Sequence, residues 1–171
     1  MKHFFIIFPL FLLTILSFGQ VSNKTVPIFI NKNSVQVELF GHGLFYSLNY
    51  ERLILNSTKF KTTVQIGCSY YPPVTDIRDF WFPILINEIF TFNQHHFELG
   101  VGQVYINEAI RDNNNKAISW IGDKFLTARI GYRFQKPDSH LIIRAGFTPI
   151  MEYTEGKEFH PLGGVAFGYS F

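Results

Sequence analysis

The amino-acid sequence predicts an all-β fold, an eight-stranded antiparallel up-and-down transmembrane β-barrel, and three observations predict it. Apolar and polar residues alternate with period two along most of the chain, as in strands with two different faces. Short turns and longer loops alternate between these strands. Only 16% of the residues are charged and 18% are aromatic, whereas an average soluble domain has about 25% charged residues.

The first residues have the pattern of an export signal. Lys2 gives a positively charged start, the run 4–18 is almost entirely apolar, and Ser17 and Gly19 are small residues suited to cleavage before Gln20. The run is short for a membrane helix and contains a proline, which disfavours the alternative of an uncleaved anchor. We therefore expect a cleaved signal peptide, an N-terminal lead-in segment and a barrel, over residues 1–19, 20–33 and 34–171.

Eight segments after the signal carry the alternation expected of strands. They cover residues 34–39, 44–51, 60–70, 84–92, 97–102, 126–134, 141–148 and 164–171. The fourth segment alternates least regularly because Glu88 falls among apolar residues of the same parity, and a β-bulge there would restore the pattern. The lone Cys68 lies in the third segment, where we interpret it as a small apolar side chain.

The connections between these segments alternate in length. Short turns are expected at 56–59, 93–95 and 135–139, and longer loops at 72–82, 107–121 and 151–161, with the tight reversal at 41–43 as the exception. Barrels of the bacterial outer membrane have short periplasmic turns and longer loops outside the cell. The pattern therefore predicts that the long loops face outward and that both ends of the barrel lie in the periplasm.

A soluble barrel of the lipocalin kind is the alternative, because it also alternates, with its apolar face turned inward. Its polar face would meet water and should be rich in lysine and glutamate. Here that face is mostly glycine, serine, threonine, asparagine and glutamine, which suits the confined interior of an eight-stranded barrel. Aromatic residues also gather near both predicted ends of the strands, as in the girdles of membrane barrels. The residues therefore favour a membrane barrel of a Gram-negative outer membrane.

A few charged residues share the inward parity. They are Glu51, Glu98, Arg129, Arg133 and Arg144, all expected in the periplasmic half of the barrel. Because charges in a packed interior must pair, we interpret this set as an ionic network that fills the lumen. We expect Glu98 to approach Arg129 from the neighbouring strand and Glu51 to lie across the lumen. A proton or ion path is the alternative, for which the sequence holds no specific signal.

Some eight-stranded outer-membrane barrels are lipid-modifying enzymes, and such a deacylase needs a nucleophile, a histidine and a carboxylate within reach of one another. The residues near the expected outer rim that have these chemistries are His42, Ser69, Asp76, Glu155, Glu158 and His160. No spacing brings a serine, a histidine and an acid together on one strand, and solvated loop residues are the simpler interpretation. We therefore predict no catalytic residue.

No metal or cofactor site is predicted. His95 and His96 are adjacent, so on a strand they point to opposite faces. The run 112–115 offers oxygen ligands but lacks the ordered carboxylates of a calcium loop. A net charge of +2 gives no reason to expect a nucleic-acid partner.

The chain ends on Phe171, with Tyr169, Phe167 and Val165 at every second position before it. This last segment resembles the C-terminal signature of bacterial outer-membrane proteins. The resemblance implies that the segment is an assembly signal presented to the barrel-assembly machinery, with periplasmic chaperones as further partners during biogenesis.

Four stretches resemble a group of small outer-membrane β-barrel proteins, for most of which no activity is established: YSLNYER (46–52), RIGYRF (129–134), RAGFTPI (144–150) and HPLGGVAFGYSF (160–171). The resemblance implies the fold, a location in the cell outer membrane, and contact with outer-membrane lipid and lipopolysaccharide. We expect a non-enzymatic protein with a structural, surface-interaction or envelope-integrity role. A lipid A or phospholipid deacylase or acyltransferase that uses rim residues is the alternative, and a narrow pore is the third possibility.

Overall fold

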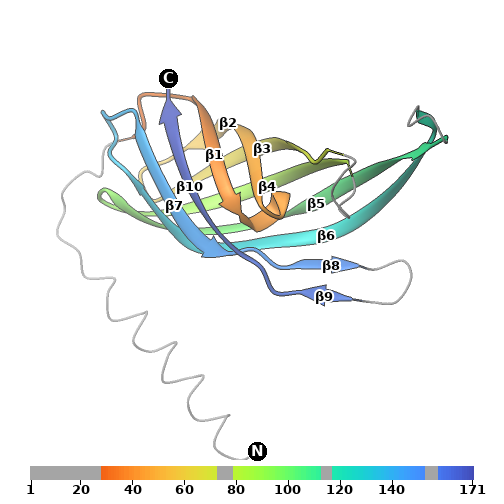
Figure 1. Cartoon of the computed structure of the whole chain (residues 1–171). Coiled ribbons are helices and arrows are strands. Elements are labelled where there is room, and N and C mark those ends of the chain that lie inside the picture. The colour runs from red at the N-terminus through yellow and green to blue at the C-terminus, as the bar shows by residue number, and fades with distance from the viewer. Residues whose placement is uncertain (1–27, 73–78, 113–116, 153–157) are drawn as a thin grey trace, which may run out of the picture.

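The computed structural model describes residues 28–72, 79–112, 117–152 and 158–171, and it is built of β-strands apart from one short 3₁₀ helix (Figure 1). The expected signal peptide and most of the expected lead-in segment lie outside the described residues. Within these ranges, no helix has the length and apolar character needed to cross a membrane.

The elements follow one another in the order β1 (Asn33–Phe40), η1 (Gly41–Gly43), β2 (Tyr46–Asn56), β3 (Phe60–Tyr70), β4 (Phe80–Phe92), β5 (His95–Arg111), β6 (Ala117–Gln135), β7 (Leu141–Phe147), β8 (Ile150–Glu152), β9 (Phe159–His160) and β10 (Gly163–Ser170). Only residues 148–149 separate β7 from β8, and only residues 161–162 separate β9 from β10. Each of these pairs is therefore one strand with a short interruption.

Eight strands form a closed antiparallel ring, in the order β1–β2–β3–β4–β5–β6–β7–β10, and β10 pairs with β1 to close it. The all-β class and the antiparallel ring of eight strands are thus confirmed. The register that starts at Phe134 of β6 and runs once round the ring returns to β6 at Lys124, ten residues away. With about 3.3 Å per residue and about 4.8 Å between strands, this stagger tilts the strands by roughly 40°.

The ring has two different ends. The turn end carries the turns around residues 57–59, 93–94 and 136–140, together with the first residue of β1 and the last residue of the chain. The opposite end, which we call the loop end, carries η1 and the tips of the longer strands.

The inner and outer faces of the ring differ sharply in polarity. Inward side chains are buried and mostly polar, as Ser47, Asn49 and Glu51 show in β2. Outward side chains are mostly apolar and exposed; Leu48 of β2 is 60% exposed and Val101 of β5 is 67% exposed. The polar parity therefore lines the interior, and the apolar parity covers the outside.

The β-bulge considered near Glu88 is not present in β4. The strand keeps an unbroken register with both neighbours through this residue. The Glu88 carboxylate instead faces outward, where Oε2 accepts a hydrogen bond from Thr62 Oγ1 at 2.7 Å. Because the neighbouring strand supplies this partner, the backbone keeps its regular pairing. A register shift occurs in β2, between Leu53 and Leu55.

The wall of the ring is tallest at β5 and β6 (Figure 1). β5 continues to Arg111 and β6 begins at Ala117, so most of the stretch 107–121 is a strand hairpin, and the expectation of a loop there is wrong. β4 also begins at Phe80, four residues before the expected start near Ile84. The expected loop 151–161 likewise contains β9 and most of β8.

An apolar cluster lies inside the ring towards the loop end. It consists of Val104 and Ile106 of β5 and Ile150 of β8, and three partly buried residues pack against it: Trp81, Phe125 and Leu162. The paired strands around the cluster satisfy their backbone groups while they cover it, whereas an irregular loop over it would leave polar backbone groups unpaired. Beyond the cluster, residues 117–122 of β6 are exposed, and backbone pairing with β5 continues the hairpin there.

At the turn end, residues 28–32 cross the opening of the ring, and we call this segment the strap. The side chain of Asn56 clamps the backbone of Phe29, because its Oδ1 accepts from the Phe29 amide at 3.3 Å and its Nδ2 donates to the Phe29 carbonyl at 2.8 Å. The amide of Ile30 donates to the carbonyl of Pro137 at 3.2 Å on the far side of the opening. The strap therefore ties β2 to the turn between β6 and β7.

The ring of Phe29 is the part of the strap that enters the interior. It is buried, meets the ring of His96 edge to face at a centroid distance of 5.2 Å, and lies below the Lys61 ammonium at 4.7 Å. The guanidinium carbon of Arg133 lies 6.0 Å from the same ring. An aromatic face next to two cations is a favourable arrangement. The Phe29 ring is therefore a stabilising contact below the charged interior.

Replacing Phe29 with alanine should lower the free energy of unfolding by about 3 kcal/mol, since the buried ring and its cation contacts are lost. Ile30→Ala is the matched control, because that side chain is 70% exposed in the same strap, and it should change stability little. Urea unfolding of the chain refolded in detergent micelles, followed by tryptophan fluorescence, measures both. Equal effects of the two substitutions would contradict a stabilising role of the buried Phe29 ring.

Candidate functional site: the charged interior

Four charged side chains from four strands meet in the turn-end half of the interior: Glu51 of β2, Glu98 of β5, Arg133 of β6 and Arg144 of β7, all buried. Arg133 Nη1 donates to both oxygens of Glu51, at 2.8 and 3.0 Å. Arg144 holds Glu98 at two points, one of them Nε to Oε2 at 2.9 Å, and its Nη1 lies 3.4 Å from Glu51 Oε2. Arg144 thus joins the two carboxylates into one network, which we call the lower layer.

Two glutamines add hydrogen bonds to this layer. Arg144 Nη1 donates to the side-chain oxygens of Gln36 and Gln65, at 2.8 and 2.9 Å. Gln36 Nε2 in turn donates to Glu51 Oε2 at 2.5 Å. A buried charge is tolerated when an opposite charge and enough hydrogen-bond partners surround it. The glutamines therefore turn separate ion pairs into a continuous layer.

A second group of polar residues, the upper layer, lies nearer the loop end. Arg129 Nη2 donates to Glu38 Oε1 at 2.5 Å, and Ser47 Oγ donates to Glu38 Oε2 at 3.3 Å. His42 of η1 is buried beside them, with Nε2 3.2 Å from the carbonyl oxygen of Ala128. The upper layer therefore joins β1, η1, β2 and β6.

Both ring nitrogens of His42 have polar partners. A carbonyl oxygen only accepts hydrogen bonds, so Nε2 donates to Ala128. Nδ1 lies between Arg129 Nη2 at 3.0 Å and Glu38 Oε2 at 3.3 Å. The imidazole is therefore held on both sides by the upper layer.

All five residues expected in the ionic network are buried inside the ring. Four of them form the lower layer, but Arg129 does not, and the expected contact between Glu98 and Arg129 is wrong. In the register of β5 and β6, Glu98 lies opposite Gly131, whereas Arg129 lies opposite Gly100, two residues nearer the loop end. At that level Arg129 meets Glu38 instead.

Several further ionisable residues are buried although the sequence pattern was not taken to place them in the network, among them Glu38, His42 and Lys61. Glu38 and Lys61 share the polar parity of their strands, and this signal was sufficient to include them. Lys61 Nζ donates to Thr91 Oγ1 at 2.9 Å, directly above Phe29. The expectation of His42 at an exposed rim is wrong, because the tight turn of η1, with φ +74° at Gly41, folds inward.

Little space remains between these side chains. The cavity between the strap and the lower layer has a volume of about 10 Å³, enough for one water molecule. Nearer the loop end, the amide oxygens of Asn49 and Asn87 lie 2.1 and 2.2 Å from where a Cβ atom would stand on Gly67 and Gly100. The glycines leave room for these amides, and the amides fill it. The interior of the described ring is therefore packed.

The residues with catalytic chemistry do not assemble in the described part of the chain. His42 has both ring nitrogens occupied, and Ser69 is buried in the interior. His160 lies on β9, exposed, with Nε2 3.5 Å from an oxygen of Glu158. Two of the candidates lie outside the described residues: Asp76 and Glu155.

The two adjacent histidines occupy opposite faces of β5. His95 is exposed, with Nδ1 2.6 Å from the hydroxyl of Tyr132, and His96 is buried, with Nε2 2.9 Å from the carbonyl oxygen of Gln135. Among the residues that the structure describes, no three histidine, cysteine or acidic side chains gather so as to hold a metal ion. Of the run 112–115, only Asp112 is described.

The residues expected to form the assembly signal lie on β10 and at the chain end, and all of them project from the outer wall with exposed fractions above two fifths: Val165, Phe167, Tyr169 and Phe171. β10 pairs with β7 on one side and with β1 on the other. The amide of Phe171 donates to the carbonyl of Asn33 at 2.8 Å. The last strand therefore closes the ring up to its final residue.

Glu98→Ala removes the two-point partner of Arg144 and leaves a buried guanidinium with unmet donors, so it should cost about 3–5 kcal/mol of unfolding free energy. Adding Arg144→Ala should recover part of this loss, because it removes the guanidinium that Glu98→Ala leaves without its partner. Glu98→Ala with Arg129→Ala is the matched pair and should show weaker coupling, because Arg129 bonds Glu38 and interacts with Glu98 only at longer range. Urea unfolding of refolded variants measures the coupling; the reverse pattern would contradict the two-layer arrangement.

Comparison of the chain with protein-family models, with curated proteins and with solved structures gave no match in any of the three. The function of this chain is therefore inferred from its own geometry.

Proposed function

We propose that this protein is an integral β-barrel of a Gram-negative outer membrane with a non-enzymatic role in envelope structure or surface interaction. The observation that carries the proposal is the inverted polarity of the ring, with charged layers at its centre and apolar side chains around its outside. A ring built for water would exchange these faces, because burial of apolar surface is the dominant favourable term in folding.

The apolar outer surface is continuous round the ring. Each of the eight strands contributes exposed aliphatic or aromatic side chains, for example Val37, Leu48, Ile66, Ile86, Val101, Ile130, Leu141 and Phe167. Monomeric soluble proteins rarely expose contiguous apolar patches larger than a few hundred Å². Hydrocarbon is the solvent in which such a surface is stable, and a closed ring leaves no unpaired strand edge to face it.

Aromatic residues mark both ends of this surface. Towards the loop end, the Tyr70 and Phe80 rings lie 4.9 Å apart and the Phe80 and Phe82 rings 6.0 Å apart between centroids. Towards the turn end, the Phe90 and Phe97 rings lie 6.2 Å apart. Two aromatic bands around an apolar belt are typical of membrane barrels at the two membrane–water interfaces, and they support the proposed insertion.

The packed interior supports a structural role over a pore. The strap crosses the turn end of the interior, and the two charged layers fill the middle. The apolar cluster around Val104 and Ile106 lies towards the loop end. An eight-stranded ring has only enough interior for side chains. The interior carboxylates and the two nitrogens of His42 are engaged in pairs, which also supports a non-enzymatic protein.

The proposed location brings partners with it. We propose that outer-membrane lipid covers the apolar belt and that lipopolysaccharide meets the loop-end aromatic band. The exposed alternating side chains of β10 fit a segment that the barrel-assembly machinery receives from periplasmic chaperones. Nucleic acid is not among the proposed partners, since the outer surface is apolar rather than basic.

Cysteine labelling tests insertion and orientation together. In a Cys68→Ser background, cysteines at Ser119 and Lys124 of the tall hairpin should react with a membrane-impermeant maleimide on intact cells. Cysteines at Thr58 and Lys136, in turns of the opposite end, should react only after the outer membrane is disrupted. Labelling of the turn positions alone would invert the orientation, and labelling of all four on intact cells would contradict insertion.

The non-enzymatic role predicts that lipid A and phospholipids have the same acyl chains in cells with and without the gene. Mass spectrometry of extracted lipids measures this, with a strain that carries the gene on a plasmid as the control. An acyl-chain change that the plasmid reverses would replace the structural role by a lipid-modifying one.

A further inference from the structure

The 3₁₀ helix η1 lies inside the ring, although it connects two neighbouring strands at the loop end. Its residues Gly41, His42 and Gly43 are all buried, and the element lies close to strands on several sides of the ring, which are β1, β2, β3, β4 and β10. His42 Nε2 also donates to the carbonyl of Ala128 in β6 at 3.2 Å. This connection between β1 and β2 therefore crosses the interior at the level of the upper layer.

The backbone is strained on both flanks of η1. Phe40, just before it, has φ +61° and ψ −154°, a region that is populated almost only by glycine. Leu44, just after it, has φ +67° and ψ −86°, close to the rare and strained form of the γ-turn. Both conformations are costly for a residue with a Cβ atom, so both flanks favour a different path of the chain.

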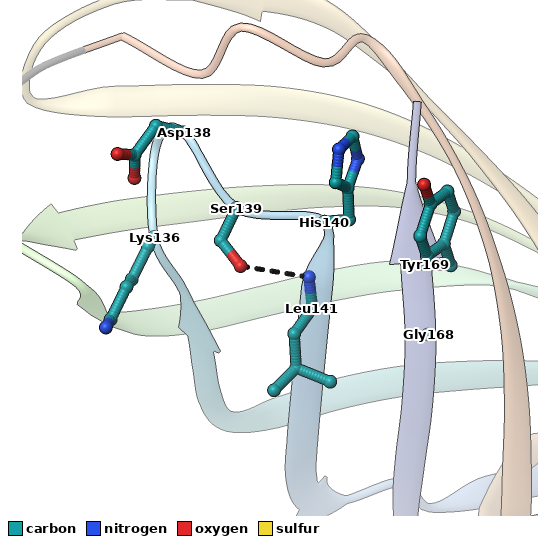
Figure 2. Close-up of a pocket in the computed structure, with 7 residues that line it drawn as sticks. All are labelled: Lys136, Asp138, Ser139, His140, Leu141, Gly168 and Tyr169. Atoms are coloured by element: carbon teal, nitrogen blue, oxygen red, sulfur yellow. Dashed lines mark hydrogen bonds between the residues drawn. The ribbon is translucent and has the colours of Figure 1, made fainter.

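The other described turns need no such strain. Within the described residues, a positive φ outside glycine occurs at one further position, Asn93, and asparagine tolerates this conformation. Figure 2 shows the turn between β6 and β7 at the opposite end of the ring, where Ser139 Oγ accepts a hydrogen bond from the amide of Leu141 at 3.2 Å. That turn is closed by local hydrogen bonds, so the strain around η1 is not a general feature of the connections in this ring.

Two side chains hold η1 in its inward position. The hydroxyl of Tyr71 donates to the carbonyl of Gly43 and accepts from the amide of Phe45 at 2.9 Å. The imidazole of His42 bonds β6 through Nε2 and has Arg129 Nη2 3.0 Å from Nδ1. Because these contacts are made only while η1 is folded inward, they offset the strain on its flanks.

The fit of η1 in the interior leaves no spare room. A Cβ atom on Gly43 would stand 2.3 Å from Ser69 Oγ and 2.6 Å from Ser47 Cβ. A Cβ atom on Gly41 would stand 2.9 Å from Oε1 of Glu38. A side chain at either position would push η1 out of the interior, so the inward position depends on both residues being glycine.

We propose that η1 is a strained lid over the upper layer, which is held closed by Tyr71 and His42 and opens outward at the loop end. Opening relieves the strain on both flanks and admits water to Glu38 and Arg129, which are buried while the lid is closed. Two alternative packings of one segment make a switch, because strain favours one and specific bonds favour the other. The lid goes beyond the proposed function, since it concerns the interior of the ring whatever surrounds the ring.

The rate at which diethylpyrocarbonate modifies His42 measures opening, because this reagent acylates an accessible imidazole nitrogen. The full chain is treated in detergent micelles and digested with trypsin, and mass spectrometry assigns each modified histidine. The tryptic peptide 33–52 contains His42 and no other histidine. The exposed His160 gives the rate for an open site, and His96, which is buried at the turn end, reports opening of the whole ring. In the unaltered chain His42 should react far more slowly than His160.

Tyr71→Phe removes the hydroxyl that holds the lid and keeps the aromatic ring, so it should speed the modification of His42 about tenfold. Tyr105→Phe is the matched control, because its hydroxyl bonds a glutamine of β5 instead, and it should leave the rate unchanged. The rate at His96 should stay the same in both variants. An equal rise at His42 and His96 would mean that the whole ring loosens and would overturn the lid.

Gly43→Ala should also speed the modification of His42, since the added methyl group cannot fit beside the inner wall while the lid is closed. Gly163→Ala is the matched control, because a Cβ atom there would meet its nearest neighbour at 3.4 Å, an ordinary contact. The control should react as the unaltered chain does. Equal rates in the two alanine variants would overturn the lid.

The strain is tested at Phe40 in the Tyr71→Phe background, where opening is frequent enough to measure in both directions. Phe40→Ala removes the exposed ring and keeps the strain, whereas Phe40→Gly removes both. The glycine variant should therefore modify His42 about tenfold more slowly than the alanine variant. A merely more flexible loop predicts the opposite order. Equal rates, or a faster glycine variant, would overturn the proposal that strain opens the lid.

Discussion

Three glutamates and four lysine or arginine side chains are buried inside a ring of only eight strands: Glu38, Glu51, Glu98, Lys61, Arg129, Arg133 and Arg144. In a region of low dielectric, each of these charges is tolerated only with a partner of opposite sign or a full set of hydrogen bonds. The strands that carry them must therefore hold a fixed stagger. Arg144 illustrates this dependence, because its guanidinium joins carboxylates from β2 and β5 with glutamines from β1 and β3. If one strand slipped by one residue in its register, the inward charges of that strand would face outward.

The outer wall and the two closed ends follow from the same constraint. Since the inward parity is used for polar and charged residues, the outward parity is left to apolar side chains, which cover the outside of the ring. Water that entered from either end would weaken the ion pairs by raising the local dielectric. The strap with Phe29 and the cluster around Val104 lie on opposite sides of the charged layers. Burial between them is thus part of the stabilisation of the interior.

Because the interior of the ring is packed, the exposed polar and aromatic groups lie on its outside and at its ends. The hairpin of β5 and β6 extends well past η1, and the turn between β6 and β7 combines a stacked histidine and tyrosine with a lysine and an aspartate. These surfaces differ in kind, since the hairpin is a long pair of strands and the turn gathers a few charged and aromatic side chains.

The sequence by itself determined the class of fold and the face on which each residue lies, because strand parity is a local property that neighbouring residues reveal. The burial of Glu51, Glu98, Arg133 and Arg144 was predictable for this reason, and the same signal covered Glu38 and Lys61. Which charges meet was decided by the tertiary structure. The stagger round the ring sets the level of every residue, and it places Arg129 beside Glu38 rather than Glu98. The inward fold of His42, the hairpin across 107–121 and the strap with Phe29 were also beyond the sequence. Each depends on contacts between segments far apart in the chain, and local pattern carries no information about such distances.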